Sequence, residues 1–433
     1  MRSEHSGWTL LWAAALVAGL APGCTRPAPR DSAPLTLGLP GQDNAEVDAA
    51  SRGSTVVLAW AASKSGLGTQ VFAAVSTDAG RTFGEPRRVD DGQGVVRVSG
   101  EQPPRVAIGA WEIAVLWTAK QGDFTEIRAA RSSDGGRTFG PSASVHQPGL
   151  TGARGWASLA FDGKDRLHAL WLDGRNEKMV MPGGSHASMS GAASAGQHVH
   201  SPRQDLYHSI VDTTAAPVES QVADHVCFCC KTAIVARPDG SALAAWRHIF
   251  PNSERDIGFA ALSPAGDRAG EIQRVSMDRW ELDACPDDGP SMVVDARDRT
   301  HIVWPTLVPG EKPSKGIFYT SAGAGGRFGE RVRLDDGTST SSSHPHVVLD
   351  GADGLAVVWD VPMGGSRRVI LRRATLESGA TRWAPQEILP SEVAAYYPVI
   401  AAVADGLVIA WTSDASPNSM IVVQRIGRGA ANH

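Results

Sequence analysis

The sequence lacks two features that would place it in common functional classes. It has no excess of basic residues, because 41 Lys and Arg stand against 46 Asp and Glu, a formal net charge of −5. A nucleic-acid partner normally needs a basic face, so we expect none. After residue 23 the sequence also has no apolar run of membrane-spanning length, which argues against a helical membrane domain.

The N-terminal residues form the pattern of a secretory signal. Arg2 gives a positive start, 9–20 is an apolar stretch, and the segment ends at Cys24. The stretch is too short and wrongly flanked for a spanning helix. Its end is similar to a bacterial lipobox, although Ala21 and Pro22 replace the usual residues. We predict a signal peptide over 1–23, a lipidated Cys24 with a tether over 24–33, and an exported, envelope-bound protein; ordinary signal cleavage is the alternative.

The most regular feature is a tryptophan that ends a short apolar run. It occurs seven times, as Trp60, Trp117, Trp171, Trp246, Trp304, Trp359 and Trp411. The intervals are 57, 54, 75, 58, 55 and 52 residues. Self-similarity at this period indicates an array of supersecondary units and not a domain with a single core.

Each unit repeats the same order of short β-rich runs and turns with Gly and Asp, which is typical of a four-stranded meander. The first two runs are apolar at nearly every position, as in a sheet covered on both faces. We therefore predict an all-β propeller over 34–433 with seven blades, or six if one unit is degenerate. Only eight residues follow the last strand-like run, 420–425, so we expect 34–39 to complete the last blade.

Two segments carry a closely matched turn motif. Asp78, Gly80 and Phe83 in the first unit correspond to Asp134, Gly136 and Phe139 in the second. The carboxylate is suited to accept backbone N–H groups, the glycine supplies a positive φ, and the aromatic ring anchors the turn. The motifs resemble the Asp box, or bacterial neuraminidase repeat, of the sialidase superfamily. The resemblance implies structural turns opposite the ligand face, and it says little about activity.

A second resemblance covers most of the chain after the signal. The segments 227–231, 246–251, 254–257 and 285–290, with Trp280, are similar to bacterial Asp-box proteins labelled sialidase-like or exo-α-sialidase. Familiar sialidases have six blades and an early Arg-Ile-Pro element, which is missing near 45–49. Tyr397 occupies the position of their nucleophile, but Pro398 follows it. We therefore expect a non-catalytic protein, with an exo-α-sialidase-type hydrolase using Tyr397 as the alternative.

Cysteines gather in the loops between blades, which open on the usual ligand face of a propeller. Cys227, Cys229 and Cys230 precede the fourth unit, and Cys285 precedes the fifth. With Cys24 lipidated, four cysteines remain, so Cys285 is expected to bridge to Cys229 or Cys230. The alternative is a soft-metal site for copper or zinc, helped by His225 or by the insertion 178–203. The candidate ligands in that insertion are Met179, Met181, His186, Met189, His198 and His200.

Charged and aromatic residues fall in loops of the same face. They are Arg247, Arg255, Asp256, Trp280, Asp283, Asp287 and Asp288, with His344, His346, Tyr396 and Tyr397 entering the last two units. The charged residues form either a salt-bridged network that holds the loops or the lining of a polar pocket, in which arginine suits a carboxylate. We predict a ligand-binding face for a small molecule, a glycan or an envelope protein, and the sequence leaves the ligand open.

Overall fold

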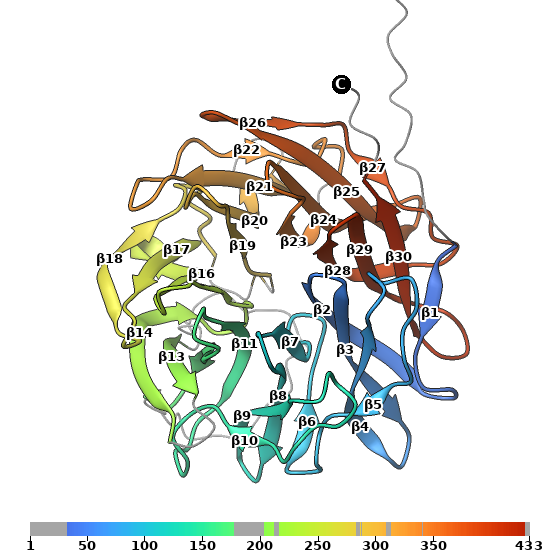
Figure 1. Ribbon diagram of the computed structural model, residues 1–433. Coiled ribbons are helices and arrows are strands. Elements are labelled where there is room, and N and C mark those ends of the chain that lie inside the picture. Colours follow the sequence, from blue (N-terminus) through green and yellow to red (C-terminus); the bar gives the residue numbers. More distant parts are fainter. Residues whose placement is uncertain are drawn as a thin grey trace, which may run out of the picture.

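The computed structural model describes residues 33–176, 203–211, 216–282, 286, 288–308, 313–339 and 341–428. These residues form antiparallel strands around a central axis, with one 3-10 turn at Pro251–Ser253 (Figure 1). The predicted all-β propeller is confirmed. Within the described ranges, no helix has the length and apolarity needed to cross a membrane.

Within the sheets, the strands lie from the axis of the ring outward, largely in chain order. The first unit has β2 (Asp43–Arg52), β3 (Thr55–Lys64), β4 (Gly68–Ser76) and β5 (Arg87–Arg88). The second has β6 (Val95–Arg97), β7 (Arg105–Ile108), β8 (Ile113–Gln121), β9 (Phe124–Ser132) and β10 (Ala143–Ser144). The third has β11 (Arg154–Phe161), β12 (Leu167–Asp173), β13 (Arg203–Val211) and β14 (Val218–Cys227).

The remaining units repeat this order. The fourth has β15 (Ala233–Ala236), β16 (Ala242–Phe250), β17 (Glu254–Leu262) and β18 (Arg268–Arg274). The fifth has β19 (Ser291–Val294), β20 (Thr300–Val308), β21 (Ser314–Ala322) and β22 (Val332–Arg333). The sixth has β23 (Ser343–Leu349), β24 (Gly354–Met363), β25 (Ser366–Glu377), β26 (Ala380–Trp383) and β27 (Glu387–Ile388). The seventh has β28 (Ala395–Val403), β29 (Gly406–Ser413) and β30 (Met420–Gly427).

Strand pairing links some of these units. The third and fourth form one eight-stranded sheet, because β14 and β16 share a single pair, Val226 with His248. Dividing the sheet at this pair gives seven units, one for each repeat tryptophan. In the seventh unit, β1 (Leu35–Leu37) pairs antiparallel with β30, so the N-terminal strand occupies the fourth place of the last sheet as the sequence predicts.

The core lies between neighbouring sheets and is built by the second strand of each unit. All seven repeat tryptophans are buried. Side chains alternate along β3: Leu58 and Trp60 pack with residues of the seventh unit, whereas Val57 and Ala59 pack with residues of the second. A strand with neighbours on both faces must be apolar throughout, which explains the continuous apolar runs in the sequence.

The two turns that resemble Asp boxes, called Asp-box turns below, lie between the third and fourth strands of their units. Asp78 Oδ1 accepts hydrogen bonds from the backbone N–H groups of Arg81 and Thr82, at 3.0 and 2.9 Å. Asp134 repeats this geometry with Arg137 and Thr138. Although burial opposes it, hydrogen bonds from Thr82 and Ser76 lower the pKa of Asp78 to about 2. The carboxylates therefore serve as turn acceptors, as predicted.

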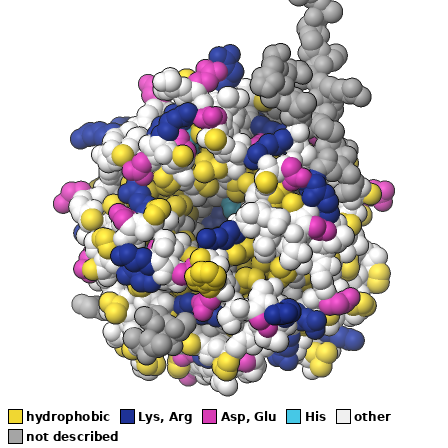
Figure 2. Space-filling view, in the orientation of Figure 1, with side chains coloured by type: hydrophobic (Ala, Val, Ile, Leu, Met, Phe, Trp, Pro, Cys, Tyr) yellow, Lys and Arg dark blue, Asp and Glu magenta, His cyan; other side chains and the backbone are white. Residues whose placement is uncertain are grey.

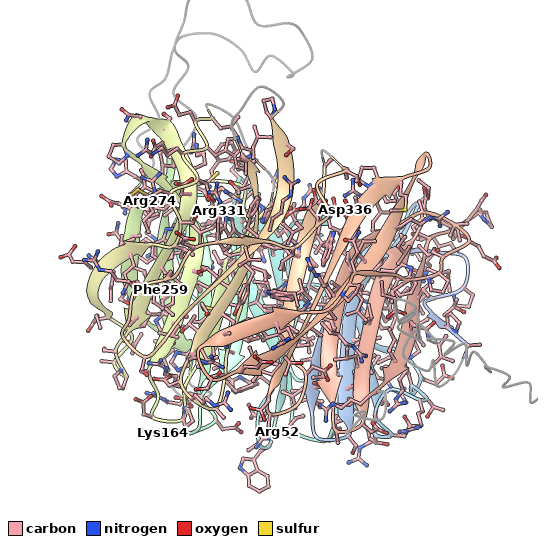
Figure 3. The ribbon with its side chains drawn as sticks, turned by 90° about the horizontal axis from the view of Figure 1, so that it is seen from above. Arg52, Lys164, Phe259, Arg274, Arg331 and Asp336 are labelled. Atoms are coloured by element: carbon pink, nitrogen blue, oxygen red, sulfur yellow. The ribbon has the colours of Figure 1, made fainter. Side chains whose placement is uncertain are left out.

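The two faces of the propeller carry different turns. Figure 3 shows Arg52 and Lys164, from turns between first and second strands, at one edge of the molecule, and Asp336, from a connection between units, toward the other. The Asp-box turns share the face of Arg52, because Ala79 N–H donates to the carbonyl of Ser54 in the neighbouring turn. The face where the connections between units open is therefore separate from the Asp boxes.

Candidate functional site

Four of the first strands carry the same irregularity opposite the repeat tryptophan. In each, a β-bulge inserts one extra residue, and its first residue has a positive φ of 51 to 61°. The four residues are Glu46, Trp156, His344 and Tyr397. A positive φ is costly for residues other than glycine, and such strain gathers at functional sites. The bulges occur near the starts of the first strands, which are the strands nearest the axis. Each bulge therefore changes the direction of one side chain close to the axis.

A pocket of about 190 Å³ lies among these strand entrances. Residues of all seven first strands line it, and Figure 1 shows β2, β7, β11, β19, β23 and β28 closest to the centre of the ring. Figure 2 views the ring from the opposite face, the side of Arg52 and Lys164 in Figure 3, and shows a hollow at its centre with a histidine visible in it. We call this cavity the axial pocket and define it by Asp48, Gly100, Arg105, Lys231, His344 and Tyr397.

His344 is the centre of a hydrogen-bonded chain in the axial pocket. Its Nε2 lies 2.9 Å from Glu101 Oε1, and its Nδ1 lies 2.8 Å from Asp360 Oδ2. Its backbone N–H donates to Asp288 Oδ2 at 2.8 Å. Burial opposes the charged ring, but Asp360 and Glu101 outweigh it and raise the pKa of His344 to about 9. His344 is therefore an imidazolium at neutral pH.

Tyr397 packs against this imidazolium. The two ring centroids are 4.1 Å apart, and the Tyr397 backbone N–H donates to Asp360 Oδ2 at 2.8 Å. A Cβ at Gly100 would lie 1.9 Å from Tyr397 Cζ, so only glycine leaves room for the ring. Burial, followed by the charge of Glu101, raises the pKa of Tyr397. The phenol is therefore protonated at neutral pH.

Asp288 is the carboxylate that accepts the backbone N–H of His344, and it is completely buried. Its two oxygens lie 3.7 Å from Lys231 Nζ and 3.4 Å from Lys315 Nζ. Although burial opposes it, Lys315 and His344 lower the pKa of Asp288. Glu101, Asp288 and His344 have ligand atoms within 4.8 Å of one another, and Asp288 also pairs with two ammonium groups. The cluster is thus a network of charges of both signs within the protein.

Two acidic residues of β2 complete the site. Burial, followed by the charge of Glu101, raises the pKa of Glu46 to about 7. Asp48 accepts the Val106 backbone N–H at 2.9 Å and lies 3.4 Å from Arg105 Nε, yet burial raises its pKa. The oxygens Glu46 Oε2, Asp48 Oδ1 and Glu101 Oε2 are buried and accept no hydrogen bond from the part of the chain that the structure describes.

The predicted arginine cluster lies beside the axial pocket and holds loops together. Arg247 is 1% exposed and donates to the carbonyls of Asp288, Arg255 and Pro305. Its guanidinium lies 5.1 Å from the ring centroid of the buried Trp280. Asp256 forms an ion pair with Arg274 and accepts the N–H of Arg279. Of the two alternatives, the geometry at Arg247, Arg255 and Asp256 matches the loop-holding network, whereas Asp288 reaches the axial pocket.

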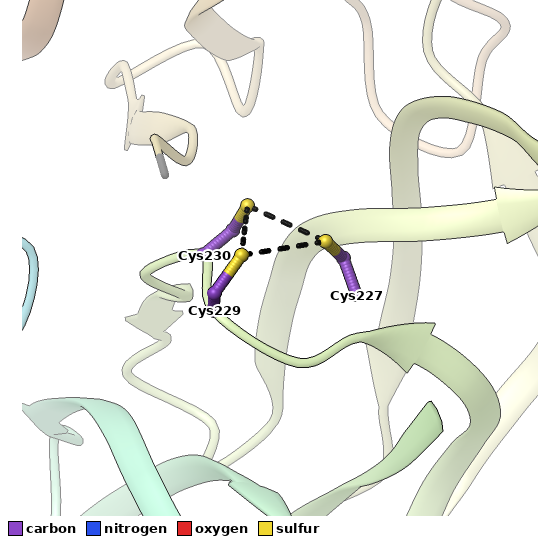
Figure 4. Close-up of side chains that lie close together, drawn as sticks. All are labelled: Cys227, Cys229 and Cys230. Carbon is purple, nitrogen blue, oxygen red and sulfur yellow. Dashed lines mark hydrogen bonds between the residues drawn. The ribbon is translucent and has the colours of Figure 1, made fainter. Parts of the chain in front are cut away.

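The three described cysteines lie together beside Trp156 and Phe228 (Figure 4). Their sulfur atoms are 3.7 to 3.9 Å apart, so no disulfide joins them to one another. Cys227 and Cys230 are free thiols, which contradicts a bridge from Cys285 to Cys230. A bridge from Cys285 to Cys229, and the metal alternative, stay predictions. Cys285, Asp283, Asp287, Cys24 and the His/Met insertion lie outside the described residues.

Sequence reasoning identified His344, Tyr397 and Asp288 and missed the other charged residues of the pocket. The missed residues are Glu46, Asp48, Glu101, Arg105, Lys231, Lys315 and Asp360. A signal existed for one of them: each bulge residue stands 14 or 15 positions before its repeat tryptophan, and Glu46 does so before Trp60. Asp48 and Arg105 lie on first strands but not at a bulge, and the others come from connections and from second or third strands, so no repeated spacing marks them.

Comparison with protein-family models and with curated proteins gives no match. Solved structures with the same fold do match. A polysaccharide lyase of family PL25, an ulvan lyase bound to a GlcA–Rha3S unit, is 10% identical with a TM-score of 0.56, covering 91% of this chain and 96% of that one. The polysaccharide lyase Uly1 is 11% identical, with a TM-score of 0.51 and coverages of 90% and 91%. An α-L-arabinofuranosidase of Fusarium graminearum, with an iminosugar inhibitor, is 15% identical, with a TM-score of 0.50 and coverages of 90% and 98%. At these identities the likeness establishes the propeller fold.

Proposed function

We propose that the axial pocket binds the terminal residue of a glycan. The observation that carries the proposal is the pocket itself, which has charged and polar groups of both signs at the point where all seven first strands converge. Its volume of about 190 Å³ is below the roughly 300–1,000 Å³ of pockets for drug-sized ligands. A pocket of this size suits one small polar residue and not a long segment of chain.

The hydrogen-bonding groups of the pocket complement sugar hydroxyls. Asp48 Oδ1, on a residue that lines the pocket, and Glu101 Oε2, next to the lining residue Gly100, are buried acceptors without a partner among the described residues. A buried acceptor left unpaired costs about 1–3 kcal/mol, and a hydroxyl donor from a ligand would recover that cost. Arg105 and Lys231, which are partly exposed, supply donors for ring or carboxylate oxygens.

The solved structures add support from their ligands. Two of the similar propellers have bound carbohydrate-like molecules, a GlcA–Rha3S unit in one and an iminosugar in the other. The proposal that this chain also takes a carbohydrate extends that likeness beyond the fold. Together with the predicted signal peptide and lipidated Cys24, we propose a lipid-anchored envelope protein that binds a glycan and does not cleave it.

A glycoside hydrolase of the sialidase type is the second candidate. One observation favours it: Glu46 holds its proton up to about pH 7, while Asp288 stays ionised, and such a divergence of carboxyl pKa values is typical of acid and base pairs. Against it stands the raised pKa of Tyr397, which disfavours the phenolate that a nucleophile needs.

Binding is tested by calorimetry of the full chain against oligosaccharides with neutral, uronic-acid and sialic-acid ends. We expect Asp48→Asn and Glu101→Gln to weaken binding at least about tenfold, because each hydroxyl bond to a charged group contributes roughly 1.5–3 kcal/mol. Trp111→Ala is the control, since Trp111 is 82% exposed in the turn between β7 and β8 on the other face. Unchanged affinity in both pocket variants would refute the proposal.

Turnover is measured on the same panel with fluorogenic glycosides. We expect no release of fluorophore from a sialoside. Robust release that Tyr397→Phe abolishes would establish the hydrolase in place of the binding protein.

A further inference from the structure

The cysteine cluster contains a pair of free thiols that the proposed function does not use. Cys227 ends β14 and Cys230 lies in the turn that follows, and each is 1% exposed. Two residues separate them, so they form a Cys-x-x-Cys segment. Their sulfur atoms are 3.7 Å apart, and Figure 4 shows both pointing into the same small space.

A disulfide between these two sulfurs requires only a small movement. The bond length is about 2.05 Å, so the atoms must approach by roughly 2 Å. The turn between the two residues has no regular hydrogen-bonded partner strand, because β14 ends at Cys227 and β15 begins at Ala233. The separation is therefore close enough for bond formation by side-chain rotation and a local shift of the turn.

The surroundings distinguish the two thiols. The Cys230 S–H donates to the Cys227 sulfur, so Cys227 is the acceptor of the pair and Cys230 holds its proton. Arg255 Nη1 is buried without a hydrogen-bond partner among the described residues, while its Nε donates to the Leu282 carbonyl, and the charge of this guanidinium acts on Cys227. Cys227 is thus the nucleophile and Cys230 the resolving thiol.

We propose that Cys227 and Cys230 form a redox-active dithiol that a small hydroperoxide oxidises to a disulfide. The Cys227 thiolate attacks the outer oxygen of the peroxide; an S–O bond forms, the O–O bond breaks, and the alcohol or water leaves with a proton. The sulfur of Cys230 then attacks the sulfur of Cys227, and water leaves with the Cys230 proton. The two thiols lose two electrons and two protons, and the hydroperoxide is reduced to an alcohol and water.

The dithiol is connected to the axial pocket through the chain. Lys231 follows Cys230, lines the pocket, and pairs with Asp288. The carbonyl of Lys231 lies so close to Gly289 that a Cβ there would be 2.0 Å away. A shift of Cys230 therefore reaches Lys231 directly, and oxidation is expected to move an ammonium group of the pocket.

The experiment uses the full chain, reduced, exchanged into buffer without reductant, and treated with hydrogen peroxide. After rapid alkylation and digestion, we expect the peptide containing residues 227–230 to lose two hydrogens through a Cys227–Cys230 bridge, and dithiothreitol to reverse the loss. Cys227→Ser should abolish it, whereas Trp111→Ala should not change it.

Three results would overturn the proposal. In the first, both thiols resist peroxide in the folded protein and react only after denaturation. In the second, Cys227 advances to a sulfinic acid with Cys230 still free, which shows that no resolving step occurs. In the third, the purified protein contains stoichiometric copper or zinc that protects both thiols. Because the wild-type peptide gives the answer, a Cys227→Ser chain that fails to fold leaves the test intact.

Discussion

The charge of His344 makes a prediction that can be worked through from the structure. The pKa of this ring rises from 6.5 to about 9, since Asp360, Glu101 and Asp288 face it and outweigh its burial. A group whose pKa is raised on folding contributes stability that is fully present below the unfolded pKa and is lost as the pH rises through the folded pKa. For His344 the loss falls between pH 6.5 and about 9. At 1.36 kcal/mol per pKa unit, the contribution is about 3 kcal/mol.

The perturbation is His344→Asn, which keeps a polar side chain tolerant of the positive φ but carries no charge at any pH. The free energy of unfolding is measured by urea titration at about pH 6 and at about pH 10, on either side of the transition. We expect the difference between wild type and variant to shrink by about 3 kcal/mol from the lower to the higher pH. Other groups, such as Cys227, whose lowered pKa adds stability as the pH rises from about 7 to 9, occur in both proteins and cancel.

The control is His346→Asn, two residues further along β23. Burial lowers the pKa of His346 to about 3, so its ring is neutral in both states above pH 6.5, and its contribution is lost only as the pH falls from there. The difference in free energy of unfolding between His346→Asn and wild type should therefore stay constant above pH 6.5. If the difference for His344→Asn also stays constant with pH, His344 is not charged at neutral pH, and the proposed network of charges in the axial pocket is wrong.

Three further predictions concern other parts of the molecule. Asp78→Ala should lower the free energy of unfolding by about 1–2 kcal/mol, through turn N–H groups that lose their acceptor, and leave glycan affinity unchanged; a loss of affinity at constant stability would contradict the structural role. Gly80→Ala should lower the free energy of unfolding by roughly 2–4 kcal/mol in urea denaturation, because its φ is +81° and the new Cβ would lie 2.4 Å from Val408 Cγ2. The control Gly53→Ala, at φ +62° with no atom near the new Cβ, should lower it by only about 1 kcal/mol. Equal losses in the two variants would argue against the close contact at Gly80. Cys24→Ala should release the protein from the membrane fraction, and retention after a salt wash would exclude the lipid anchor.

The sequence predicted the architecture well because the architecture depends on repeated local patterns. A tryptophan in a continuous apolar run marks the second strand of every unit, and the structure buries all seven. The completion of the last sheet could also be predicted, from the missing fourth strand after 420–425 and the strand-like run at 34–39. Both features follow from the burial of a sheet between two neighbours, which constrains composition at every position.

The axial pocket was only partly predictable because its charges meet across distant parts of the chain. Glu101, His344 and Asp360 belong to a connection, a first strand and a second strand, and no spacing in the sequence places them within hydrogen-bonding distance. The same holds for Arg247, which has the residue type of a ligand-binding arginine but is enclosed by three carbonyls. Its role depends on burial, and burial of a single polar residue in a loop has no signature in the sequence.

The bulges opposite the repeat tryptophans also bear on how such a protein changes over evolutionary time. The backbone at Glu46, Trp156, His344 and Tyr397 follows the same path in four different sheets, although the four side chains share neither size nor charge. A repeat tryptophan stands opposite each bulge, so the path goes with the tryptophan and not with one type of side chain at the bulge. Each of these sheets thus has one position where the side chain can differ while the backbone keeps its path, although an exchange at Tyr397 must also suit His344 and Gly100.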